Sequence, residues 1–165
     1  MQVLETLCRH IADNCERLQH VEFGLLVRAE NMQPVWSEHA PELKEGFKLY
    51  CSEEDNSAMS LHDFLRFLKE TKIAGARLGV PAMVDIFSCV QEEASDSSST
   101  DTMDYDEFLE AIAACAVYMD PSPYLSLPTK VLEFMKATVL PGMEAAKSKK
   151  KGRQPSKKEL VKKKK

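Results

Sequence analysis

The chain has 165 residues, 44% of them hydrophobic, and its formal net charge of −4 hides two opposed parts. Residues 1–146 carry eleven basic and 25 acidic side chains (−14), whereas residues 147–165 carry eleven basic side chains and one acid (+10). This composition supports one core of ordinary size. The apolar runs are too short to cross a bilayer, and five cysteines without C-x-x-C spacing indicate reduced thiols. We therefore expect neither a membrane protein nor a secreted disulfide scaffold.

Residues 1–30 have the periodicity of an amphipathic helix. Apolar side chains recur every seven residues, with two more on the companion stripe: Leu4, Leu7, Ile11, Leu18, Val21 and Leu25. The spacing predicts one or two helices across 2–28, within an N-terminal segment at 1–40, and the stripe would receive a partner helix wherever the core leaves it uncovered. No signal peptide is expected. Pro34 and Pro41 should interrupt helix, and Trp36 should anchor this connection in the core.

Two helix–loop–helix units follow, and their sequences repeat. Each has a helix, a polar loop, a lone Met, and then an acid four positions later that precedes Phe-Leu. The first unit contains Met59 and Asp63-Phe64-Leu65, and the second contains Met103 and Glu107-Phe108-Leu109. We predict helices over about 42–52, from 61 onward after a capping box of Ser60 and Asp63, from Pro81 onward, and over 104–119. This is the EF-hand pattern occurring twice, and EF-hands usually pair.

A closing helix and a basic tail complete the chain. Prolines at 121, 123 and 128 predict a rigid bend, and apolar residues at 131, 132, 134 and 135 predict a helix over about 129–139. Pro141-Gly142 is predicted to end that helix, so the paired units and the closing helix occupy 41–141. The tail, 142–165, is expected to be disordered. The predicted fold class is all-α: paired EF-hand-like units, an N-terminal amphipathic helical segment, a C-terminal helix and a disordered basic tail.

The second loop is the better candidate for a metal ion. With Met103 at position 8 of an EF-hand loop, oxygen-bearing residues fall on ligand positions: Asp96, Ser98, Thr100, Asp104 and Glu107. Position 6, which is usually Gly, is Asp101, and the apolar positions of the entering helix end early, so either that helix runs longer or the loop has four extra residues. The first loop has Ser52 at position 1 and Asp63 at position 12. We favour loops that only join helices, with Ca²⁺ or Mg²⁺ at the second loop as the alternative.

The quoted residues resemble the EF-hand superfamily, and specifically its degenerate members. The order Met59-x-x-x-Asp63-Phe64, then 85–87, then Met103-x-x-x-Glu107-Phe108 is similar to the core of the tubulin polymerization-promoting protein family. It is also similar to EF-hand-like proteins of cilia and flagella, and the likeness covers residues 43–118. The resemblance implies binding to microtubules or axonemal partners without chemistry. The long N-terminus, the Pro-bounded last helix and the Lys-rich tail depart from that pattern.

The basic tail supplies the predicted partner-binding residues. They are Lys147, Lys149, Lys150, Lys151, Arg153, Lys157, Lys158, Lys162, Lys163, Lys164 and Lys165. Such a tail seeks polyanions. The acidic body and the lack of aromatics in the tail disfavour nucleic acid, and no lipidation site or inserted helix accompanies the charge. Acidic tubulin tails are preferred, while an import signal and a tail that touches its own acidic body remain open.

We therefore expect a non-catalytic structural or adaptor protein of the microtubule cytoskeleton, with tubulin or other axonemal proteins of the cilium or flagellum as partners. No nucleophile with triad context and no Gly-rich phosphate loop is visible, so no small-molecule substrate and no cofactor are expected. The alternative is a calcium-responsive EF-hand regulator that binds target helices.

Overall fold

The computed structural model describes residues 20–51, 57–75, 77–91 and 102–153. Most of them are helical, as predicted, and the paired strands β1 and β2 form the one sheet in these ranges. The elements run α2 (His20–Arg28), η1 (Glu30–Met32, 3₁₀), α3 (Gln33–Glu38), α4 (Ala40–Tyr50), β1 (Met59–Ser60), α5 (Leu61–Glu70), α6 (Val80–Gln91), β2 (Thr102–Met103), α7 (Tyr105–Met119), α8 (Leu127–Phe134), η2 (Met135–Val139, π-helix) and α9 (Leu140–Arg153).

The two strands bring the sequence repeats together. β1 and β2 are antiparallel, and Met59 lies opposite Met103, so the residues that the repeat aligns are direct neighbours. A capped helix follows each strand: the Ser60 hydroxyl accepts from the Asp63 amide at 3.2 Å, and Asp104 forms a reciprocal capping box with Glu107. At Ser60 the predicted box is only half formed, because the Asp63 carboxylate accepts from the Ser60 hydroxyl instead of from its backbone.

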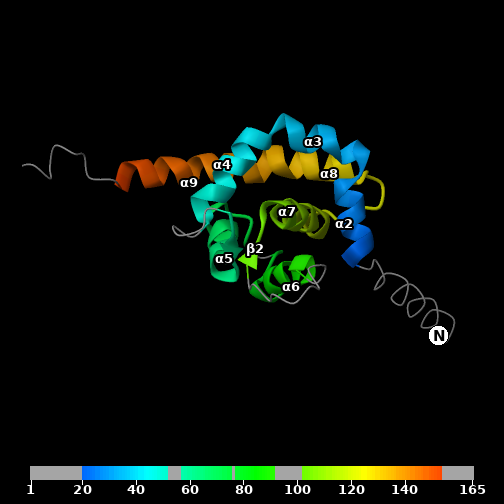
Figure 1. Cartoon of the computed structure of the whole chain (residues 1–165), viewed down its shortest axis with the longest axis horizontal. Helices are drawn as coiled ribbons and strands as arrows, with labels where there is room; N and C mark the ends of the chain where they lie inside the picture. Colours follow the sequence, from blue (N-terminus) through cyan, green and yellow to red (C-terminus); the bar gives the residue numbers. More distant parts are fainter. Residues whose placement is uncertain (1–19, 52–56, 76, 92–101, 154–165) are drawn as a thin grey trace, which may run out of the picture.

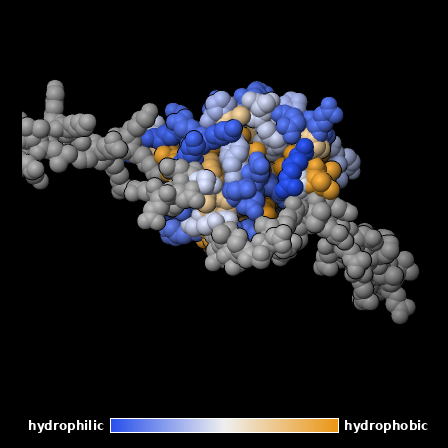
Figure 2. Space-filling model, viewed as in Figure 1, coloured by the Kyte–Doolittle hydropathy of each residue, from blue (hydrophilic) through white to orange (hydrophobic). Residues whose placement is uncertain are grey.

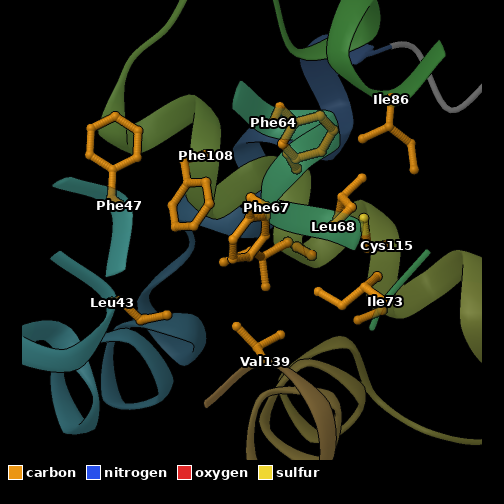
Figure 3. Close-up of a cluster of buried hydrophobic side chains, with 14 of the residues drawn as sticks. Leu43, Phe47, Phe64, Phe67, Leu68, Ile73, Ile86, Phe108, Cys115 and Val139 are labelled. Carbon is orange, nitrogen blue, oxygen red and sulfur yellow. The ribbon is translucent and has the colours of Figure 1, made fainter. Parts of the chain in front are cut away.

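Aromatic side chains form the centre of the core. Phe67 of α5 lies 5.2 Å from Phe108 of α7, ring centre to ring centre, and Phe108 lies 5.2 Å from Phe47 of α4. Phe64 adds a ring beside Phe67 and contacts Phe87 of α6. Figure 3 shows Phe67 in the middle of this cluster. Because the tilted and edge-on contacts are favourable beyond the area they bury, these rings lock α4, α5, α6 and α7 together.

The last three helical elements form one long helix, which we call the closing helix (residues 127–153). α8, η2 and α9 follow one another without a break, which gives a helix about 40 Å long. It lies across the body beside α3, α4 and α7, and its last turns project beyond the body (Figure 1). The prediction that Pro141-Gly142 ends this helix is wrong. The prediction of a disordered tail is also wrong for residues 142–153, and residues 154–165 lie outside the described part of the chain.

Two local features let the closing helix continue through Pro141-Gly142. Pro141 has no amide hydrogen, but the turn before it is widened, and the Leu140 amide donates to the Met135 carbonyl five residues back. Gly142 contacts the backbone of Thr71 at the end of α5, where a Cβ atom would lie only 2.6 Å from the Thr71 carbonyl oxygen. Gly142 therefore permits a close helix contact instead of ending a helix.

The N-terminal part departs from two predictions. Pro34 and Pro41 do not interrupt helix but occupy the first turns of α3 and α4, where a missing amide hydrogen costs nothing. Leu25 of the predicted apolar stripe is 63% exposed. The prediction for Trp36 is confirmed, because its buried indole donates to the Val27 carbonyl at 3.1 Å. The earlier stripe residues Leu4, Leu7, Ile11 and Leu18 lie outside the described residues.

Candidate functional site

The closing helix covers the apolar face of the two helix–loop–helix units. Its buried residues recur every three or four positions and so lie on one side: Val131, Met135, Val139, Met143 and Ala146. Figure 3 shows Val139 pointing into the space between Leu43, Phe67 and Ile73, which come from α4, α5 and the loop after α5. The chain therefore supplies its own amphipathic helix to a face of the kind that binds target helices in helix-in-groove complexes.

Polar contacts fasten the closing helix along its length. The Lys130 ammonium donates to the Asp120 carbonyl at 2.8 Å, Lys136 lies 3.3 Å from the Glu38 carboxylate, and Lys147 lies 2.9 Å from Glu45. Lys147 was predicted to bind a partner, but only 14% of its side chain is exposed. At this residue the basic end of the chain contacts its own acidic body.

The other predicted tail residues fall into two groups. Lys149, Lys150, Lys151 and Arg153 belong to the projecting end of α9, where Lys149 is exposed. The remaining residues, Lys157, Lys158, Lys162, Lys163, Lys164 and Lys165, lie outside the described part of the chain. Four of the predicted basic residues thus belong to a helical arm, the end of α9, instead of a disordered tail.

The structure describes only two of the five candidate metal ligands, Asp104 and Glu107. The Asp104 amide donates to Glu107 Oε2 at 2.7 Å, and the Glu107 amide donates to Asp104 Oδ1 at 2.9 Å. Both carboxylates are thus engaged in capping α7, and burial raises the pKa of the Glu107 carboxyl above its ordinary value. Asp96, Ser98 and Thr100 lie outside the described residues, and within those residues no cluster of three His, Cys, Asp or Glu side chains could hold a metal ion.

In the first loop, Ser52 also lies outside the described residues, while Asp63 sits in the first turn of α5. Its carboxylate forms an ion pair with Arg66 at 3.0 Å and accepts from Ser60 at 2.7 Å. The Asp63 carboxylate therefore interacts with neighbouring residues in the first turn of α5.

An ion pair between a buried carboxylate and a half-exposed guanidinium was not predicted from the sequence. Glu110 of α7 is 2% exposed, and the Arg28 guanidinium of α2 donates to its carboxylate at 3.1 Å. Burying a carboxylate is costly without such a partner, so the pair fixes α2 against α7. The one signal in the sequence is an acid inside the apolar run that forms α7.

Substitutions at Glu107 separate a capping role from a metal-binding role. Glu107→Gln keeps the reciprocal cap and should leave stability at pH 7 within about 0.5 kcal/mol, whereas Glu107→Ala should lose about 1 kcal/mol. The raised pKa means that the stability contributed by this carboxyl is present below pH 4.5, its ordinary pKa, and is lost as the pH rises through the folded value. As the pH rises from 4.5 through the folded pKa of Glu107, the free energy of unfolding of the Glu107→Gln variant should therefore increase relative to that of the native protein.

The measurement is thermal unfolding of the full chain in EDTA and in millimolar Ca²⁺. If Glu107 only caps the helix, the native protein and the two variants should rank in the same order of stability in both buffers. A calcium ligand would instead give a native protein that Ca²⁺ stabilises and two variants that it does not, and that result would contradict the capping assignment.

No helix in the described ranges is long and apolar enough to cross a membrane. No family model, no curated protein and no solved structure matches this chain.

Proposed function

We propose that this chain is a non-catalytic structural or adaptor protein of the microtubule cytoskeleton, in the axoneme of cilia or flagella, built on a degenerate EF-hand pair. The observation that carries the proposal is the closing helix, whose apolar side is buried on the body and whose basic end projects from it. The pairing of Met59 with Met103 supports the EF-hand assignment, because both residues hold the same position in their loops.

The projecting end of α9 suits an acidic filament surface. The body of the chain carries −14, so a basic segment lying flat on it would be neutralised, as Lys147 is by Glu45. Beyond Lys147 the helix continues with Lys149, Lys150, Lys151 and Arg153. Acidic tubulin tails present clustered carboxylates, and cations carried by a helix meet them without the ordering cost of a disordered tail.

The alternative of a calcium-responsive regulator is less well supported. Such regulators open a helix pair and expose an apolar face to a target helix. Here the closing helix buries that face, with Val131, Met135 and Val139 each 0% exposed, and Glu107 is engaged in a cap. A target helix would first have to displace the closing helix.

Microtubule co-sedimentation of the full chain tests the proposal. We expect the triple variant Lys149→Gln, Lys150→Gln, Lys151→Gln to bind microtubules about tenfold more weakly than the native chain, because three exposed charge pairs contribute about 1.4 kcal/mol together. The native interaction should also weaken as salt is added.

The matched control removes three exposed lysines from the body, Lys44, Lys48 and Lys69, and so changes the net charge equally. It should bind like the native chain if the arm makes the contact. Equal weakening of both variants would assign the effect to net charge alone, and a native chain that does not sediment with microtubules would overturn the proposed function.

A further inference from the structure

An apolar groove of about 320 Å³ lies between α2, α6 and α7. The groove is lined by Phe23 of α2, Ile86 and Cys89 of α6, and Ala114 and Val117 of α7. Glu110 of α7, which is paired with Arg28, also lines it. The groove does not involve the closing helix. It is a second apolar surface of the body, and its function is not explained by the proposed filament contact.

The walls of the groove have the spacing of a helix-binding site. α6 contributes residues 82, 86 and 89, and α7 contributes residues 110, 114 and 117, so each wall is a stripe with three- and four-residue steps. The same three helices leave large apolar side chains exposed: Leu25 (63%), Leu26 (49%), Val80 (60%) and Tyr118 (50%). Figure 2 shows an apolar patch at the end of the body where α2 lies. Of these four residues, Tyr118 lines the groove itself, and exposed apolar surface at a groove marks a binding site.

We propose that residues 2–12 of the same chain bind in this groove as an amphipathic helix. The described chain begins at His20, three residues before Phe23, so the N-terminal segment starts beside the groove. Leu4, Leu7 and Ile11 give that segment an apolar stripe with the same three- and four-residue steps as the walls. Bound in the groove, this stripe would cover the apolar side chains of its walls.

The dimensions of segment and groove agree. Residues 2–12 would form a helix about 16 Å long, and the wall from Ala82 to Val90 rises about 12 Å. Residues 13–19 reach at most about 23 Å when extended, which is enough to reverse the chain direction before α2. Asp13 and Asn14 stand at the start of that connection, and both residue types favour turns and helix caps.

Native cysteines allow a direct test in the full chain. Cys8 lies beside the stripe of the N-terminal segment, and Cys89 lines the groove. Cys51 and Cys115 are buried, and burial raises the pKa of the Cys115 thiol to about 12, which suppresses its reactive thiolate at pH 8. In a full chain with Cys15→Ser, a short bis-maleimide should therefore join Cys8 to Cys89 within one chain, as peptide mass spectrometry of the monomer band would show. A Cys8–Cys89 link between two chains would overturn the proposal in favour of a second copy.

A second measurement does not depend on the position of Cys8. In a full chain with Cys8→Ser and Cys15→Ser, the rate of maleimide labelling at Cys89 reports whether the groove is covered. If the segment covers the groove about nine-tenths of the time, Cys89 is open to labelling for the remaining tenth. Replacing Leu4, Leu7 and Ile11 by Ser should leave the groove open and so accelerate this labelling about tenfold. The matched control replaces the polar residues Gln2, Glu5 and Arg9 of the same segment by Ser and should leave the rate unchanged. Equal rates in the background protein and the stripe variant would contradict the proposal.

Discussion

Replacing Val139 by Asp is expected to destabilise the protein strongly. Val139 is 0% exposed and points into the space between Leu43, Phe67 and Ile73, so the new carboxylate would lie in an apolar environment without a partner (Figure 3). The cost of burying an unpaired charge exceeds about 4 kcal/mol, which is a large part of the 5–15 kcal/mol by which domains of this size are stable. Urea unfolding followed by circular dichroism would show the loss.

The matched control is Ala137→Asp, two residues earlier on the same helix and exposed. It adds the same charge and lowers helix propensity at least as much, yet it should cost less than about 1 kcal/mol because the side chain stays in water. If both variants unfolded at the same urea concentration, the closing helix would not contact the core through Val139.

Gly142→Ala should also be strongly destabilising, although the same substitution normally strengthens a helix. An Ala interior to a helix is favoured over Gly by about 1 kcal/mol. At Gly142, however, the added Cβ atom would lie 2.6 Å from the carbonyl oxygen and 2.7 Å from the Cα atom of Thr71. Backbone cannot rotate out of the way, so α9 must move from α5, and we expect a net loss of about 1–3 kcal/mol.

Two other glycines provide the comparison, measured by the same urea titration. A Cβ atom on Gly75 would meet nothing within 4 Å, and Gly75→Ala should be neutral or slightly stabilising. A Cβ atom on Gly46 would meet the side chain of Met143, which is flexible and can shift, so Gly46→Ala should fall between the two. A Gly142→Ala variant as stable as Gly75→Ala would mean that the closing helix does not pack against Thr71.

The sequence predicted the helices whose first residues are fixed by a capping residue or a proline. Ser60, Pro81 and Asp104 mark the starts of α5, α6 and α7, and the repeat anticipated that Met59 and Met103 hold equivalent positions. The end of the closing helix was wrong because Pro-Gly ordinarily stops a helix, whereas here a widened turn and a contact with Thr71 override that preference. A contact between residues 71 apart in the sequence leaves no trace in a local pattern.

The candidate metal site shows a different limit. An Asp followed three residues later by Glu describes positions 9 and 12 of an EF-hand loop, and it equally describes a capping box. Asp104 and Glu107 satisfy both patterns, so the sequence could not separate them, and the distances show that both residues form the cap. The groove residues Phe23, Ile86 and Cys89 were not anticipated because partial burial depends on which helices neighbour one another.

The attachment of the closing helix to the chain also affects any protein that competes for the face it covers. A segment joined by the short connection from Asp120 to Ser126 acts as a competitor present at an effective concentration in the millimolar range. If the detached helix bound that face with a dissociation constant of about 1 μM, an external helix of equal intrinsic affinity would bind about a thousandfold more weakly to the intact chain. The covered face is thereby insulated against amphipathic helices of the surrounding proteins.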